Sequence, residues 1–146
     1  MISHFAIHIR QQLKNNTVAL ISLITALSGV FYDTWRDHRN ELNENTRNAA
    51  FEVLKNLGEL QTIVNYAHFA VNTDRGNPIE GWKYVLLVRD LSHLLPQTNM
   101  QQSDTLYYTW QQDWETLQTN AKSEQNISHS IAKARAEALN TIEHLQ

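Results

Sequence analysis

The hydrophobic positions of the chain form one continuous apolar run near the N-terminus and several amphipathic stretches behind it. No charged residue occurs from Asn15 to Tyr32, between Lys14 and Asp33. A helix of this length is about 27 Å long at about 1.5 Å per residue, close to the roughly 30 Å of a bilayer's hydrocarbon core. A helix buried in a soluble core seldom stays uncharged on every face for so many turns. The pattern therefore predicts a single transmembrane anchor over residues 15–32.

The flanks of this run suit a membrane interface. Lys14 and Arg36 can extend their charges towards the head groups, and Tyr32 and Trp35 stand where an interfacial aromatic belt is expected. Residues 1–14 are predicted to form a short amphipathic segment, which is either an interfacial helix or simply the first turns of the anchor. Its apolar stripe consists of Phe5, Ile9 and Leu13.

A cleavable signal peptide is the competing interpretation of the N-terminal region. Arg10 and Lys14 resemble a basic n-region, and Ala26-Leu27-Ser28 resembles a cleavage site of small residues. The long amphipathic segment ahead of the apolar run favours an uncleaved anchor instead. Basic residues flank the run on both sides, so the side of the membrane that holds the rest of the chain stays open.

Small residues share one face of the expected anchor, and such faces let membrane helices approach each other closely. The face lacks a strict pair of glycines, so self-association through it is one option among others. Its members are Ala19, Ser22, Ala26 and Gly29.

Apolar spacing after Asp33 predicts further helices joined by short turns. A repeat near 3.5 runs from Ala50 to Val71, and nothing before Val71 stops this helix firmly, so it can continue directly from the anchor. Asn77 can cap the next helix and Pro78 can begin it. This second helix is expected over residues 79–95, with Pro96 ending it.

Two more apolar stripes follow a polar loop after Pro96. Ser103 or Asp104 is expected to cap the first. The final stripe runs from Ile127 to Leu145, and the register slips near residues 123–126, so the sequence leaves open whether 103–146 form one helix or two. The fold class predicted is all-α, with an N-terminal transmembrane helix followed by a soluble domain over 33–146. This domain is expected to be an up-down bundle of three to four helices.

Composition and charge exclude several classes of function. The chain has no cysteine, and its net charge is −3, with every acidic residue after Tyr32. An acidic domain lacks the basic face that nucleic acid requires. Phosphate loops, nucleophile elbows and HExxH motifs are missing from the sequence, so we expect no catalytic residue and no cofactor. His4 and His8 have a metal-ligand spacing but no further ligand nearby, so no metal is expected either.

The candidate interface or pocket residues lie on the second and third helices. Arg89 is surrounded in sequence by apolar residues, so we expect it to be substantially buried and paired with a carboxylate from another helix. Glu52, Glu59 and Asp113 are the candidates for that partner. Aromatic residues at helical spacing suit a core stripe, a protein interface or a ligand pocket. These aromatic candidates are Tyr107, Trp110 and Trp114.

Several runs of the sequence resemble small single-anchor bacterial proteins. They are 27–36 (LSGVFYDTWR), 45–52 (NTRNAAFE), 57–61 (LGELQ), Gly81-Trp82 and 85–91 (VLLVRDL). The resemblance implies a bacterial inner-membrane protein and carries no activity. The leading hypothesis is a non-enzymatic, single-pass accessory or scaffolding protein that binds a larger membrane complex or another copy of itself. The alternative is a small membrane-anchored sensor or ligand-binding bundle.

Overall fold

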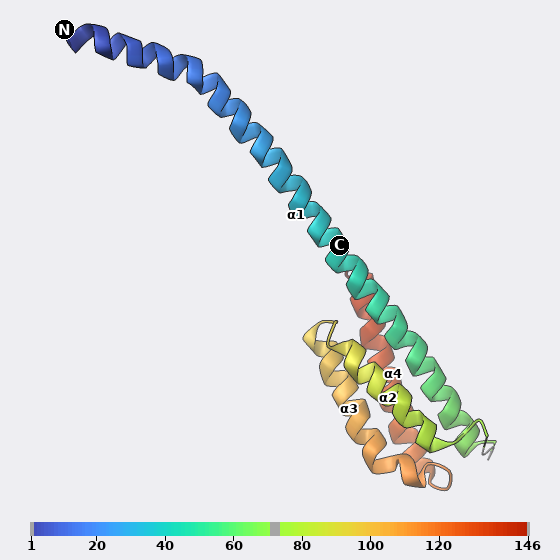
Figure 1. Cartoon of the computed structure of the whole chain (residues 1–146). Helices are drawn as coiled ribbons and strands as arrows, with labels where there is room; N and C mark the ends of the chain where they lie inside the picture. Colours follow the sequence, from blue (N-terminus) through green and yellow to red (C-terminus); the bar gives the residue numbers. More distant parts are fainter. Residues whose placement is uncertain (1, 71–73, 146) are drawn as a thin grey trace. The chain divides into compact units, whose positions relative to one another are not determined.

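The computed structural model describes the backbone of residues 2–70 and 74–145. Side chains are described for residues 16–32, 34–70 and 74–145. The stripe expected in residues 1–14, and the pair His4 and His8, lie outside the described side chains. The described residues are all-helical and contain no strand, as the sequence predicts. The elements are α1 (Ile2–His68), α2 (Pro78–Ser92), α3 (Gln97–Asp113), the short 3₁₀ helix η1 (Trp114–Thr116) and α4 (Ala121–Glu143) (Figure 1).

The chain divides into two compact units, residues 1–42 and 43–146, each of which is described by itself. The first unit belongs to α1, and its side chains over residues 16–32 are exposed throughout. Three of its hydroxyls donate hydrogen bonds of 2.7–2.9 Å to carbonyls one turn back, which removes their need for water; they are Ser22, Thr25 and Ser28. By length and composition alone, this helix can cross a membrane.

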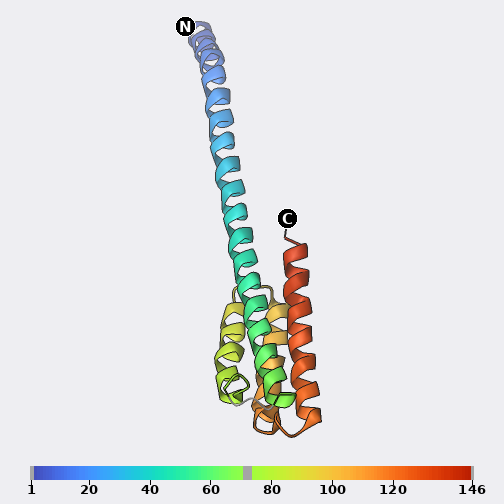
Figure 2. The same cartoon turned by 90° about the vertical axis from the view of Figure 1, so that its right-hand side faces the viewer.

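The second unit is a four-helix bundle made by the C-terminal part of α1 with α2, α3 and α4. Successive helices run in opposite directions, which both views show (Figures 1 and 2). This order follows from the short turns between them. The core contains apolar side chains from all four helices, among them Leu57, Leu60, Val85, Val88, Leu106, Trp110, Ile127 and Ile131.

Two asparagine caps fix where helices begin. The side chain of Asn77 accepts a hydrogen bond of 3.0 Å from the backbone N–H of Ile79, and Pro78 is the first residue of α2, as the sequence predicts. Asn120 accepts one of 2.9 Å from the N–H of Lys122 at the start of α4. The described residues from 103 to 145 therefore contain parts of two separate α-helices, α3 and α4, rather than one continuous helix, which the sequence had left open.

The boundaries of α2 and α3 differ from those expected. The expected α2 ended at Leu95, but the helix ends at Ser92, and the backbone N–H of Leu95 bonds the carbonyl of Ser92 in a turn. The expected cap at Ser103 or Asp104 is wrong, because α3 already begins at Gln97. The polar start of α3 is helical because its polar side chains are paired with α4: buried Asn99 donates a hydrogen bond of 2.7 Å to Thr141.

Candidate functional site

An aromatic cluster lies along the seam between α2 and α3. The ring centroid of Trp82, on α2, is 5.7 Å from that of Tyr107 on α3 and 6.3 Å from that of Trp114 in η1, both in edge-to-face arrangements. All three rings are partly buried and pack against the hydrophobic core. Edge-to-face contacts align the positive edge of one ring with the negative face of another, so the three rings hold each other in place.

Arg89 extends this cluster by one charged side chain. Its Nε atom lies 2.7 Å from Oδ1 of Asp104 on α3, and its guanidinium carbon lies 4.4 Å from the ring centroid of Tyr107. The hydrogen bond that Arg89 donates to Asp104 raises the pKa of the guanidinium above its ordinary value, against a smaller opposing effect of desolvation. The cation is thus fixed over an aromatic face by two independent contacts.

The structure corrects the expectation for Arg89 in two respects. The ion pair with another helix is present, but its carboxylate is Asp104 and not Glu52, Glu59 or Asp113. The pair is also not deeply buried, since the side chains of Arg89 and Asp104 are 34% and 44% exposed. Asp104 was overlooked because it was assigned to a helix cap. Once α3 begins at Gln97, Asp104 stands two turns inside the helix and is free to face α2.

Trp110 belongs to the core and not to the exposed seam. Its side chain is fully buried, and its six-membered ring occupies the space beside Gly81 on α2. Within the described part of the chain, its indole N–H has no hydrogen-bond acceptor. The four candidates therefore do not share one exposed surface: Arg89, Tyr107 and Trp114 lie at the seam, and Trp110 lies beneath it.

Sequence reasoning missed Trp82, although its signal was present. Trp82, Leu86 and Arg89 are spaced by four and three residues and therefore share one face of α2. Leu86 is 45% exposed, and Tyr108, whose ring centroid is 5.4 Å from that of Tyr107, is 56% exposed. We call the surface formed by Trp82, Leu86, Arg89, Tyr107, Tyr108 and Trp114 the aromatic seam.

The small residues of the expected anchor lie on the exposed surface of α1. Ala19, Ser22, Ala26 and Gly29 are all exposed, and a Cβ atom built at Gly29 would have nothing within 4 Å among the described atoms. Nothing in the described first unit covers this face. Among the described residues, no three potential metal-ligating side chains lie together.

The fold and the seam define a class of protein, namely an all-helical chain with a four-helix bundle and one helix long and apolar enough to span a membrane. No protein-family model matches the chain, and no similar protein is found among the curated proteins or the solved structures.

Proposed function

We propose that this chain is a non-enzymatic, single-pass accessory or scaffolding protein of a bacterial inner membrane. Residues 15–32 of α1 anchor it, and the bundle binds another protein through the aromatic seam. The partner is a component of a larger membrane complex or a second copy of the chain. The observation that carries this proposal is the composition of the seam, which combines tryptophan, tyrosine and a fixed arginine on a partly exposed surface.

The anchor is supported by the exposure of its apolar side chains. Val18 is 69% exposed and Phe31 is 72% exposed, and the residues between them include other large apolar side chains that are about as exposed. Moving one such side chain out of water lowers the free energy by about 1.5–3 kcal/mol. Because every turn of this part of α1 carries such side chains, the anchor strongly favours an apolar environment. A lipid bilayer supplies this environment to a helix whose backbone groups are already bonded.

The seam is supported by the physical requirements of a binding hot spot. Trp, Tyr and Arg are the residue types that contribute most at protein interfaces. Trp and Tyr bury a large area with little loss of side-chain freedom, and Arg adds a planar cation with several hydrogen-bond donors. Arg89 is held by Asp104 and by the ring of Tyr107 before any partner arrives. This preorganisation lowers the entropy lost on binding.

Site-specific photo-crosslinking in intact cells tests the proposal. A benzophenone side chain is placed at Tyr108 or Leu86 in the seam, and at Gln125, which is exposed on α4, as the control position. We expect discrete membrane-bound adducts from the two seam positions and none from Gln125. An adduct of twice the 16.9 kDa chain identifies a second copy, whereas any other mass identifies a different partner.

A matched pair of charge variants sharpens this test. Leu86 in the seam and Leu139 on α4 are similarly exposed, at 45% and 43%, so an arginine at either position reaches water without disturbing the core. Leu86→Arg should abolish the adduct formed from Tyr108, and Leu139→Arg should leave it intact. Equal crosslinking from Tyr108 and Gln125, or an adduct insensitive to Leu86→Arg, would overturn the assignment of the seam.

A further inference from the structure

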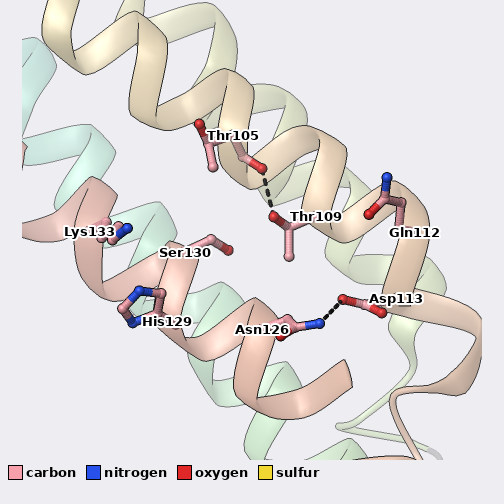
Figure 3. A pocket seen from close by; sticks show the side chains of 8 residues that line it. All are labelled: Thr105, Thr109, Gln112, Asp113, Asn126, His129, Ser130 and Lys133. Atoms are coloured by element: carbon pink, nitrogen blue, oxygen red, sulfur yellow. Dashed lines mark hydrogen bonds between the residues drawn. The ribbon is translucent and has the colours of Figure 1, made fainter. Parts of the chain in front are cut away.

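A second surface, on the other side of α3, is polar throughout. It is a groove of about 210 Å³ between α3 and α4, and Figure 3 shows its lining: four side chains from each helix, all of them hydroxyl, amide, imidazole or charged groups. Ser130 on its floor is buried, Thr109, Asp113 and Asn126 are partly buried, and the others are exposed at the rim. This groove is separate from the aromatic seam, which lies between α2 and α3.

Hydrogen bonds between side chains join α3 and α4 at both ends of the interface between these two helices. At one end, Thr98 donates a hydrogen bond of 2.6 Å to Glu137, and Asn99 donates one of 2.7 Å to Thr141. At the other end, Asp113 accepts hydrogen bonds of 2.9 Å from Asn126 and 3.2 Å from Ser123. These seven residues therefore join the two helices at the ends of their interface.

In the groove between these ends, the hydroxyls bond only to their own helix. Thr105, Thr109 and Ser130 donate to the carbonyls of Gln101, Thr105 and Ile127, at 2.8 Å in each case. Each hydroxyl oxygen keeps its capacity to accept, and no described residue donates to it. The middle of the α3–α4 interface therefore contains hydroxyl oxygens that can accept hydrogen bonds but receive none from the described residues. Hydrogen bonds between the two helices lie on either side of it.

The two ends of the groove carry opposite charges. Lys133 and His129 are one turn apart on α4, and neither forms a hydrogen bond or ion pair with another described side chain. Asp113 lies at the opposite end beside Asn126, as Figure 3 shows. Asn126 and Lys133 are seven positions apart, which corresponds to about 10 Å along a helix at about 1.5 Å per residue.

We propose that this groove binds a free α-amino acid. The carboxylate of the amino acid is bound by Lys133 and His129, and its ammonium group by Asp113 and the hydroxyl of Thr109. The ammonium nitrogen and a carboxylate oxygen of an amino acid are about 3–4 Å apart, given standard bond lengths. Hydrogen bonds of about 2.8 Å at each end extend this to about 9 Å, which is comparable to the axial rise of about 10 Å from Asn126, the hydrogen-bond partner of Asp113, to Lys133.

A ligand with a single charge can pair with only one of the two charged ends of the groove. A simple carboxylate leaves Asp113, which accepts hydrogen bonds from Asn126 and Ser123, without a cationic partner, and a simple amine leaves Lys133 without an acceptor. Both charges of the ligand are therefore required for binding, which separates this proposal from nonspecific attraction to a lysine. It stands independently of the protein partner at the aromatic seam.

Isothermal titration of the full chain in detergent micelles tests the proposal. Glycine, L-alanine, L-serine, L-aspartate and L-lysine are titrated individually, with acetate and methylammonium as the single-charge probes. We expect at least one amino acid to bind with a Kd below about 1 mM, and both single-charge probes to bind at least about tenfold more weakly. Absence of heat from all five amino acids at about 10 mM would overturn the proposal.

Variants locate the binding in the groove. Lys133→Met removes the carboxylate partner at an exposed position, and we expect it to weaken binding of the amino acid at least about tenfold. Lys122→Met is the control, because Lys122 is an exposed lysine of the same helix outside the groove. Thr109→Val removes an acceptor without touching the hydrogen bonds of Asp113, and it should also weaken binding. Unchanged affinity in Lys133→Met would assign any bound amino acid to another surface.

Discussion

Replacing Gly81 by alanine should destabilise the bundle, although alanine is the better helix former. A Cβ atom at Gly81 would overlap two carbons of the Trp110 ring, Cζ2 and Cη2. That ring is fully buried and rigid, so it cannot rotate away as a flexible side chain would. The matched control is Gly58, where no described atom outside its own stretch of helix lies within 4 Å of an added Cβ.

The magnitudes follow from two opposing effects. Alanine is favoured over glycine inside a helix by about 0.8–1.0 kcal/mol. Overpacking a core costs about 1–3 kcal/mol, and two overlapping ring atoms place Gly81→Ala at the upper end of this range. We therefore expect Gly81→Ala to lower the free energy of unfolding by about 2 kcal/mol, and Gly58→Ala to raise it by about 1 kcal/mol.

Thermal unfolding of the full chain in detergent micelles, followed by circular dichroism, measures both effects. At about 4–8 °C per kcal/mol, the melting temperature should fall by about 8–16 °C in Gly81→Ala and rise by about 4–8 °C in Gly58→Ala. Trp110→Phe removes the part of the indole that overlaps the added Cβ atom. Adding Gly81→Ala to that variant should therefore stabilise the bundle, as we expect Gly58→Ala to stabilise the wild-type chain. If Gly81→Ala stabilises the wild-type bundle as much as Gly58→Ala does, the packing of α2 on Trp110 is not as described.

Further variants test the anchor, the core and the aromatic seam separately. Leu23→Arg places a charge near the middle of the expected anchor, at a cost of about 2.5–3.5 kcal/mol, and should shift the chain out of the carbonate-resistant membrane fraction; an undiminished membrane fraction would contradict the anchor. Trp110→Ala should destabilise the bundle by about 3–5 kcal/mol in thermal melts, and Trp114→Ala clearly less, because Trp114 is only partly buried. Arg89→Met should change the melting temperature little, and adding Asp104→Asn should change it no further; a large loss in the single variant would mean that the pair is buried.

Much of the fold was predictable because local signals and packing agree. The capping pair Asn77-Pro78 and the continuous helix through residues 33–48 follow from local chemistry alone, and both are present. The all-helical class follows from few glycines and prolines together with apolar residues at helical spacing. In these places a residue's own preference and its final environment point to the same structure.

The start of α3 was not predictable from a single sequence. Residues 97–102 contain one apolar side chain, Met100, so a hydrophobic pattern cannot reveal a helix there. The segment is helical because Asn99 is buried against Thr141 on α4, forty-two residues away. A contact at this separation leaves no trace in local spacing. The same error moved Asp104 out of the helix and thereby concealed the partner of Arg89.

The exposed apolar residues of α2 bear directly on what the bundle does. The helix is rich in apolar residues, which suits either a central position in the bundle or a surface that meets a partner, and the described bundle buries only one side of it, with Val85 and Val88 in the core. Leu86 and Leu87, both on α2, remain 45% and 38% exposed. Apolar residues beyond those the core requires are unfavourable in water and have no use in an isolated bundle. A protein partner at the aromatic seam would cover Leu86 together with the ring of Trp82, so the exposed apolar residues of α2 are themselves an argument for a binding surface.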